Sequence, residues 1–188
     1  PSVVREKIEK LSGTGKKAVT IAVYGNRAYE DALLEMNDIL MKCGFTVIAS
    51  GAFVAQHSMA PEVGAGRPDG EDEKEIHKFA ESVKNSTATE NVHVPGNRPY
   101  KPEMNMPVTP ISIPSCTMCG KCVTVCPTNA ISVSDGAVIT DAEKCILCMA
   151  CTHVCTEQAR IRPLPLQQET EQMLGALKSV RNKNEVFL

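Results

Sequence analysis

The first half of the chain alternates short apolar runs with an amphipathic stretch. Residues 18–24 (AVTIAVY) and 45–49 (FTVIA) are apolar and rich in β-branched side chains, which is typical of buried parallel strands. Between them, residues 30–43 carry apolar side chains at helical spacing, and Gly44 follows as a helix stop. Strand, helix and strand in this order predict one right-handed crossover of an α/β fold with a doubly wound parallel sheet.

Two more helices are predicted in this region. Pro1 is well placed to start a helix with an apolar face of Val4, Ile8 and Leu11. Asp69 can cap a second helix that runs from about residue 71 to residue 84. A sheet that contains only two strands would leave an unpaired edge, so association into a homo-oligomer through that edge is a further hypothesis.

The pattern changes after residue 85. Residues 86–110 are interrupted by prolines and have few apolar runs, which predicts an extended linker. Residues 166–181 can form a helix whose apolar side chains, Met173, Leu174, Leu177 and Val180, pack onto a domain. The sequence therefore predicts four parts: an α/β part over 1–85, a linker over 86–110, a domain over 111–164 and a helical tail over 165–188.

Eight of the nine cysteines form two runs of the same design, and each cysteine of the second run lies 29 positions after its counterpart. The spacing C-x2-C-x2-C-x3-C-P is typical of the cysteines that hold [4Fe–4S] clusters in bacterial ferredoxins. In the second run Thr156 stands where the proline would be, which affects local rigidity and not the ligands. The cysteines are Cys116, Cys119, Cys122 and Cys126 in the first run, and Cys145, Cys148, Cys151 and Cys155 in the second.

The close spacing within each run suits a cubane cluster, because three sulfurs on one tight winding of backbone reach three corners of a tetrahedron. Zinc usually takes separated C-x2-C pairs, and disulfides suit small secreted domains, so both alternatives fit the runs less well. In two-cluster ferredoxins the fourth cysteine of each run serves the other cluster. On this pattern Cys155 completes the set of the first run, and Cys126 completes the set of the second.

The region around the runs has the features of a small α+β ferredoxin-like domain. Residues 130–133 and 138–140 read as two short strands, and Asp135-Gly136 between them favours a tight hairpin turn. Cys43 lies far from the runs at the predicted end of a helix, where we expect it to pack and not to bind a cluster.

Charge and composition narrow the function classes. The net charge of −2 and the lack of a long basic run argue against a nucleic-acid partner, and no apolar stretch is long enough to span a membrane. Thiolates kept for metal indicate a reducing cytoplasm. A [4Fe–4S] cluster with four thiolates carries a formal charge of about −2, so we expect an anionic domain and a redox partner with a basic docking patch.

The loop after the first predicted strand carries a second candidate site. Ligands of doubly wound sheets bind beyond the carboxyl ends of the strands. There Gly25 permits close approach, Tyr24 and Tyr29 can stack on a flat ring, and Asn26 and Arg27 supply donors. These residues are compatible with a flavin or nucleotide edge and equally with an ordinary strand-to-helix loop.

The whole chain resembles flavodoxin–ferredoxin fusion proteins of anaerobic microbes. The resemblance rests on GNRAYEDALLEM (25–36), Gly44-Phe45, His57-Ser58, GRPDGED (66–72), GNRPY (96–100) and the two cysteine runs. It implies an FMN-binding flavodoxin-like domain followed by a two-cluster ferredoxin domain. The strand and phosphate loop that begin a flavodoxin-like domain would lie upstream of Pro1, so the resemblance implies FMN binding only together with that N-terminal segment.

These observations lead to two functional hypotheses. The first is an electron carrier with two [4Fe–4S] clusters that exchanges electrons with a flavin or a partner redox enzyme. The second is a flavin-dependent oxidoreductase in which the clusters conduct electrons to FMN. The sequence shows no evident general acid, although His57 and Arg67 are conceivable, so it favours the carrier and leaves the question of an enzyme open.

Overall fold

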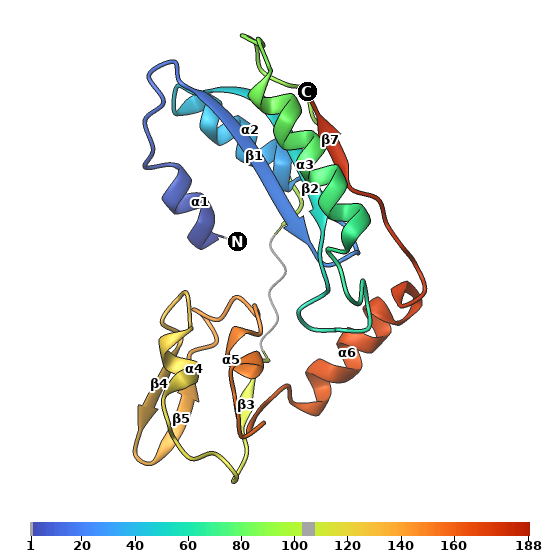
Figure 1. The fold of residues 1–188 in the computed structure, drawn as a ribbon. Helices are drawn as coiled ribbons and strands as arrows, with labels where there is room; N and C mark the ends of the chain where they lie inside the picture. The colour runs from blue at the N-terminus through green and yellow to red at the C-terminus, as the bar shows by residue number, and fades with distance from the viewer. Residues whose placement is uncertain (1, 103–107) are drawn as a thin grey trace. The chain divides into compact units, whose positions relative to one another are not determined.

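The computed structural model describes residues 2–102 and 108–188, which form two compact units (Figure 1). Among the described residues, the first unit comprises 2–57, 61–102 and 176–188, and the second comprises 58–60 and 108–175. The predicted boundaries at residues 85, 110 and 164 stay predictions, and the compact units divide the chain at other places.

The sheet of the first unit has the strand order β1-β2-β7 within the described residues. Strands β1 (Lys17–Tyr24) and β2 (Thr46–Val54) pair in parallel, as predicted, and β2 extends five residues beyond the predicted end at Ala49. The third strand, β7 (Glu185–Phe187), pairs with β2 in the antiparallel direction. The prediction of a parallel, doubly wound sheet is thus corrected to a small mixed sheet, because the last residues of the chain fill the free edge of β2.

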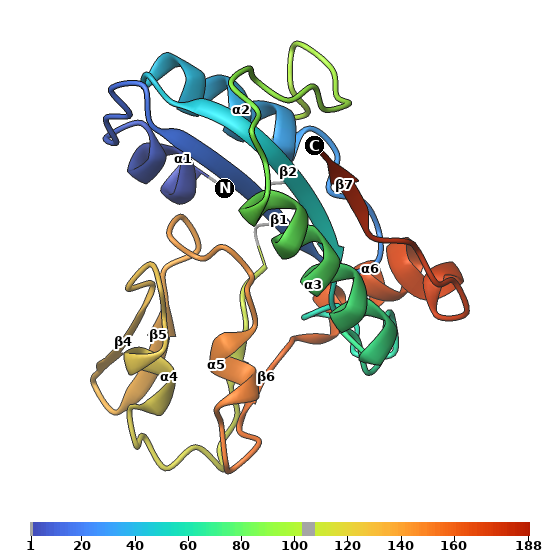
Figure 2. The same cartoon turned by 45° about the horizontal axis from the view of Figure 1, so that its top comes forward.

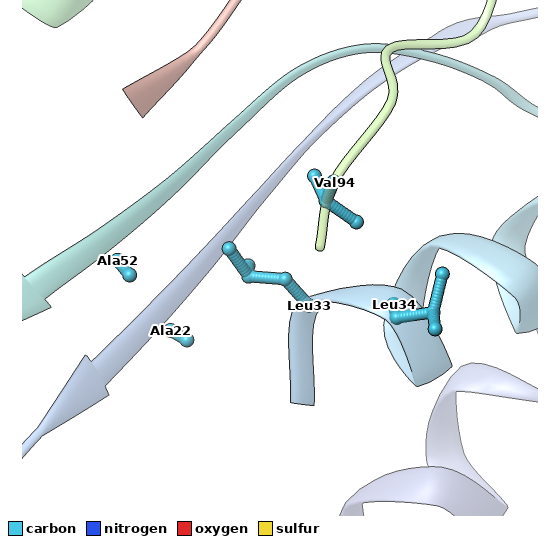
Figure 3. Close-up of a cluster of buried hydrophobic side chains, with 5 residues drawn as sticks. All are labelled: Ala22, Leu33, Leu34, Ala52 and Val94. Atoms are coloured by element: carbon cyan, nitrogen blue, oxygen red, sulfur yellow. The ribbon is translucent and has the colours of Figure 1, made fainter. Parts of the chain in front are cut away.

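Helices cover both faces of this sheet. Consecutive strand residues point to opposite faces, so Ala52 and Phe53 of β2 lie in different cores. Helix α2 (Ala32–Lys42) packs Leu33 and Leu34 against Ala22 and Ala52, and Val94 completes this cluster (Figure 3). Helix α3 (Gly70–Lys84) lies on the other face of the sheet (Figure 2). Its Phe79 packs against Phe53 there. Helix α1 (Ser2–Ile8) contacts α2.

Helix α3 starts where the sequence predicted. The Asp69 side chain accepts hydrogen bonds from the backbone N–H groups of Glu71 and Asp72. In return, the Asp72 carboxylate accepts a hydrogen bond from the Asp69 N–H. This capping box satisfies donors that the first helical turn leaves without partners. Strand β1 lies at an edge of the sheet, with Ile21 and Val23 exposed, and the hypothesis of a homo-oligomer through this edge stays a prediction.

The described part of the predicted linker packs on the first unit. Val94 lies in the core with α2, and the Val92 N–H donates to the Val47 carbonyl oxygen at 2.7 Å. Asp38 of α2 accepts two hydrogen bonds from Arg98 and one from Tyr100. Residues 86–102 are therefore irregular in structure and also held in place by specific contacts.

The second unit contains two antiparallel strand pairs and three helices within its described part. Strands β4 (Ile131–Ser134) and β5 (Ala137–Thr140) form the predicted hairpin, and strands β3 (Ile111–Ser112) and β6 (Arg160–Ile161) form the other pair. Asp135 and Gly136 both have positive φ, at 51° and 73°, as a type I′ turn requires. The helices are α4 (Lys121–Thr124), α5 (Ala150–His153) and α6 (Leu164–Leu174).

The C-terminal helix is shorter than predicted. Helix α6 ends at Leu174 and continues as a 3-10 turn over Gly175–Leu177. Leu166 and Leu174 are buried, whereas Met173 and Val180 of the predicted apolar face are 45% and 40% exposed. The prediction failed here because the residues after the helix leave it to form β7. None of the helices in the part of the chain described by the structure is long and apolar enough to cross a membrane.

Candidate iron–sulfur centre

The repeat of the two cysteine runs is also a repeat of backbone conformation. Met118 and Gly120 have φ of 54° and 76°, and the residues 29 positions later, Leu147 and Met149, have φ of 54° and 61°. Gly120 accepts hydrogen bonds from two residues of α4, and Met149 accepts the corresponding bonds from α5. Only a specific fold keeps non-glycine residues at such angles. The same tight winding is therefore built twice from different side chains.

The eight cysteines of the runs line two separate cavities. Cys116, Cys119 and Cys122 line the first cavity together with Cys155. Cys145, Cys148 and Cys151 line the second cavity together with Cys126. Each cavity thus combines three cysteines of one run with the last cysteine of the other. That each set holds a cluster, as expected from the sequence, stays a prediction.

The thiols of these cavities are buried to different extents. Burial raises the pKa of Cys145, although a backbone N–H of Leu147 acts in the opposite direction. Burial also raises the pKa of Cys126, but N–H groups of Thr128, Ala130 and Ile131 outweigh it and leave this pKa below its ordinary value. The Ala130 N–H lies 3.2 Å from the Cys126 sulfur. N–H groups aimed at a sulfur favour the thiolate, which is the form that binds iron.

The donor sets fit a polynuclear cluster better than a single ion. Nowhere in residues 2–102 and 108–188 do three His, Cys, Asp or Glu side chains converge as ligands for one metal ion. Four cysteines instead line each cavity; Cys151 in the second cavity is buried, whereas Cys119 in the first and Cys148 in the second are exposed. Four thiolates around a space form the ligand set of a [4Fe–4S] cluster.

Comparison with known proteins agrees with this chemistry. A family model described as a 4Fe-4S dicluster domain matches residues 115–160, inside the second unit. A ferredoxin-like protein from the vnf region of Azotobacter chroococcum is 39% identical over 54 residues, which cover 26% of this chain and 83% of the relative. The chain belongs to the ferredoxin-like proteins with a 4Fe-4S dicluster domain. Its second unit, called the ferredoxin domain below, serves iron–sulfur electron transfer.

Other relatives match over similar lengths. An uncharacterised ferredoxin-like protein of Haemophilus influenzae is 37% identical over 65 residues, 31% of this chain and 76% of the relative. The polyferredoxin-like subunit of an aliphatic sulfonate oxidoreductase from Pyrococcus furiosus is 45% identical over 56 residues, 29% of this chain and 30% of the relative. This chain therefore spans under a third of the length of that subunit.

Three of the five residues of the predicted flavin loop line a hollow in the structure, and the other two do not. Tyr24, Arg27 and Tyr29 line an open hollow of about 720 Å³ in the first unit. The two tyrosine rings meet edge to face, with centroids 5.5 Å apart. Their hydroxyl groups donate to the Lys183 carbonyl oxygen and to the Glu185 carboxylate, and burial raises the pKa of both tyrosines.

Gly25 and Asn26 do not line this hollow. A Cβ atom at Gly25 would come within 2.4 Å of the His57 ring, so Gly25 lets these two segments pack. Asn26 is fully buried, and its side chain donates to the Val180 carbonyl oxygen and accepts from the Asn182 N–H. The donor expected from Asn26 is therefore used inside the protein.

Arg67, considered from the sequence as a catalytic group, is also committed to internal contacts. It is 7% exposed and donates to both carboxylate oxygens of Asp72 and to the Asn182 carbonyl oxygen. Cys43 lies in the first unit with its sulfur 3.7 Å from the Ile8 and Glu9 carbonyl oxygens, outside both cysteine cavities.

Sequence reasoning missed several residues that line the hollow. Asn97 and Lys101 come from the predicted linker, and Asn182, Lys183 and Glu185 come from the end of the chain. Asp31 positions the first group, because it accepts hydrogen bonds from the N–H groups of Asn97 and Lys101. The motif GNRPY over residues 96–100 was the signal that this segment had a specific position.

Proposed function

We propose that this protein is an electron carrier that holds two [4Fe–4S] clusters in its ferredoxin domain, with crossed ligation. The observation that carries the proposal is the grouping of the thiols. Cys155 lies in the cavity of Cys116, Cys119 and Cys122, and Cys126 lies in the cavity of Cys145, Cys148 and Cys151. The crossed sets tie the two cysteine runs together and keep the two clusters close to each other.

In this role the protein binds the clusters, directs backbone N–H groups to their sulfur ligands and shields them from water. The thiolates hold the clusters, which supply one-electron chemistry when bound. Backbone N–H groups reach the sulfurs, that of Ala130 at Cys126 and that of Leu147 at Cys145, and such hydrogen bonds tune reduction potentials. Ala130, Ile131 and Ala159 are buried beside the cavities and restrict water. No side chain is assigned a proton-transfer step.

Metal analysis and cysteine substitution test the proposal. Anaerobically purified protein should contain about eight iron and eight sulfide per chain. Cys155→Ser should damage the cluster of Cys116, Cys119 and Cys122, and Cys126→Ser should damage the other, as followed by electron paramagnetic resonance of singly substituted proteins. Cys43→Ser is the matched control and should keep the full iron content. Damage confined to the cluster of the substituted residue's own run would contradict the crossed assignment.

We infer that the partner is a redox enzyme with a basic docking patch. A polyferredoxin-like subunit of an oxidoreductase is among the relatives, and two clusters would give the domain a negative charge of about −4. Binding should then weaken as salt is added, because surface attraction is screened. Isothermal titration with a flavoenzyme reductase at low and high ionic strength measures this, and an affinity that is independent of salt would exclude charge-guided docking.

A second candidate function is flavin-dependent oxidation and reduction, with FMN bound at the first unit. The hollow of about 720 Å³ favours it, because Tyr24 and Tyr29 line one part of it. Arg27 and Lys101 also line the hollow, and both are paired with Glu30. Titration of the protein with FMN, followed by flavin fluorescence, tests this candidate. Lack of quenching at high protein concentration would leave the carrier as the function of the chain.

A further inference from the structure

The two cysteine cavities differ at one pair of equivalent positions. Ile131 lines the second cavity and is 6% exposed. Arg160, which lies 29 positions later in the repeat, lines the first cavity and is 4% exposed. Both residues start the short strand that follows their cysteine run, β4 or β6. The fold therefore places an apolar side chain beside one cavity and a guanidinium beside the other.

The guanidinium of Arg160 has neutral partners. It donates to the Ser112 hydroxyl at 3.2 Å and to the Thr140 hydroxyl, and its Nε atom is buried without a hydrogen-bond partner in the described residues. The partners of the guanidinium among the described residues are these two hydroxyl groups and no carboxylate. Ser112 lines the first cavity and Thr140 lines the second. A buried cation with only neutral partners is costly unless an anion lies nearby.

The remaining charges around the cavities do not remove this difference. Lys121 and Glu157 also line the first cavity, but both are exposed and opposite in sign, so solvent screens them. The second cavity has no charged side chain among the described residues that line it. Arg160 also favours the thiolate of Cys122, although burial has the larger effect and raises the pKa of that thiol.

We propose that Arg160 is a buried counter-charge that raises the reduction potential of the cluster held by Cys116, Cys119, Cys122 and Cys155 above that of the other cluster. The inference rests on the proposed function. Reduction adds one electron, taken from a one-electron donor such as a reduced viologen, and the formal charge of the cluster falls from about −2 to about −3. A nearby cation stabilises the more negative form more strongly, so the first electron resides beside Arg160.

A redox titration followed by electron paramagnetic resonance tests the proposal on the complete protein. The two clusters should be reduced in separate steps, with at least about a tenfold preference for the first cavity, which is ~59 mV for a one-electron couple. Cys119→Ser and Cys148→Ser stand at equivalent positions and should each alter the signal of one cluster, which identifies the cluster that is reduced first. If the unsubstituted protein first reduces the cluster that Cys148→Ser alters, the proposal is overturned.

Substitution of Arg160 then separates charge from packing. Arg160→Met keeps much of the side-chain volume, and Arg160→Gln keeps a hydrogen-bonding group. Both should lower the reduction potential of the first-cavity cluster by ~59 mV, which is a tenfold change in the equilibrium constant. Arg160→Lys keeps the positive charge and should retain most of the potential difference. Ile131→Met is the matched control and should move neither potential by a comparable amount. Equal potentials of the two clusters in the unsubstituted protein with full iron content, or potentials that Arg160→Met leaves unchanged, would refute the inference alone. Protein without iron and sulfide would refute the proposed function.

Discussion

Buried polar side chains in the first unit are matched with partners over long distances in the sequence. Thr20, Asn37 and Ser50 form a closed set of hydrogen bonds between β1, α2 and β2. Arg67 and Asp72 form an ion pair whose side chains are only 4% and 2% exposed. The hydrogen bond from Arg67 is the main reason that the pKa of Asp72 lies far below its ordinary value. The pair thus stabilises the folded state with Asp72 ionised.

The ionisation of Asp72 makes the stability of the first unit depend on pH. Because the pKa of Asp72 is lower in the folded state, its contribution is complete above its unfolded pKa of about 4 and is lost as the pH falls toward the folded value. We expect the stability of the first unit to decrease as the pH is lowered below ~4, and Asp72→Asn to flatten this dependence. Tyrosine fluorescence reports it, since Tyr24, Tyr29 and Tyr100 all lie in the first unit.

The ion pair between Arg67 and Asp72 also contributes to the free energy of unfolding near neutral pH. Asp72→Asn leaves the buried Arg67 charge without its counter-ion and should cost on the order of 3 kcal/mol in the free energy of unfolding by urea. Glu71→Gln is the control, because that side chain is 81% exposed and its ion pair with Arg181 is worth little. Equal losses in the two variants would contradict the structural role of the pair.

Elements with a strong local pattern agree closely with the sequence prediction. Strand β1, helix α2, the capped helix α3 and the hairpin of β4 and β5 all lie within a few residues of their predicted positions. Helix α6 and strand β7 do not, because the sequence after Leu174 has a helical apolar pattern that the tertiary contacts override. Local periodicity identifies an element only when its neighbours allow it.

The hairpin turn offers a test at the scale of one element. Gly136 has φ of 73° and nothing lies within 4 Å of an added Cβ, so Gly136→Ala should cost about 1 kcal/mol through backbone strain alone. Ser132→Ala in β4 is the control, because that exposed position lies in the same hairpin and has no positive φ. Thermal loss of the visible cluster absorption measures the ferredoxin domain. A loss of stability no larger than that of the control would contradict the assigned turn.

At the scale of the whole molecule, the last residues of the chain complete the first unit. Asn184 accepts a hydrogen bond from the Val54 N–H and donates to Asp72 and Glu75. Asn182 bonds to Asn26, and β7 pairs with β2. The chain therefore leaves the first unit, builds the ferredoxin domain and returns to the first unit at its end.

Truncation after Arg181 should consequently destabilise the first unit and leave the ferredoxin domain unaffected. We expect a large loss of stability in the first unit, seen by tyrosine fluorescence in urea, because buried Asn26 and Asp72 lose partners. Iron and sulfide content should stay unchanged, since all eight cysteines of the runs lie in the ferredoxin domain. Removal of Leu188 alone, which is 64% exposed, is the control. Loss of iron from the truncated protein would show that the units do not behave independently.

The sequence by itself determined the chemistry of the centre and the main elements, because ligand spacing and apolar periodicity are local properties that can be read along the chain. The candidate flavin loop shows the limit of such reading. Asn26 has a suitable side chain for binding a ligand, but that side chain is already hydrogen-bonded to Asn182. Only the tertiary structure decided that β7 joins β2, that residues 96–101 are held by Asp31 and Asp38, and that Arg160 is among the residues lining the first cavity and not the second. Each of these depends on contacts between residues far apart in the sequence, whose pairing no local pattern records.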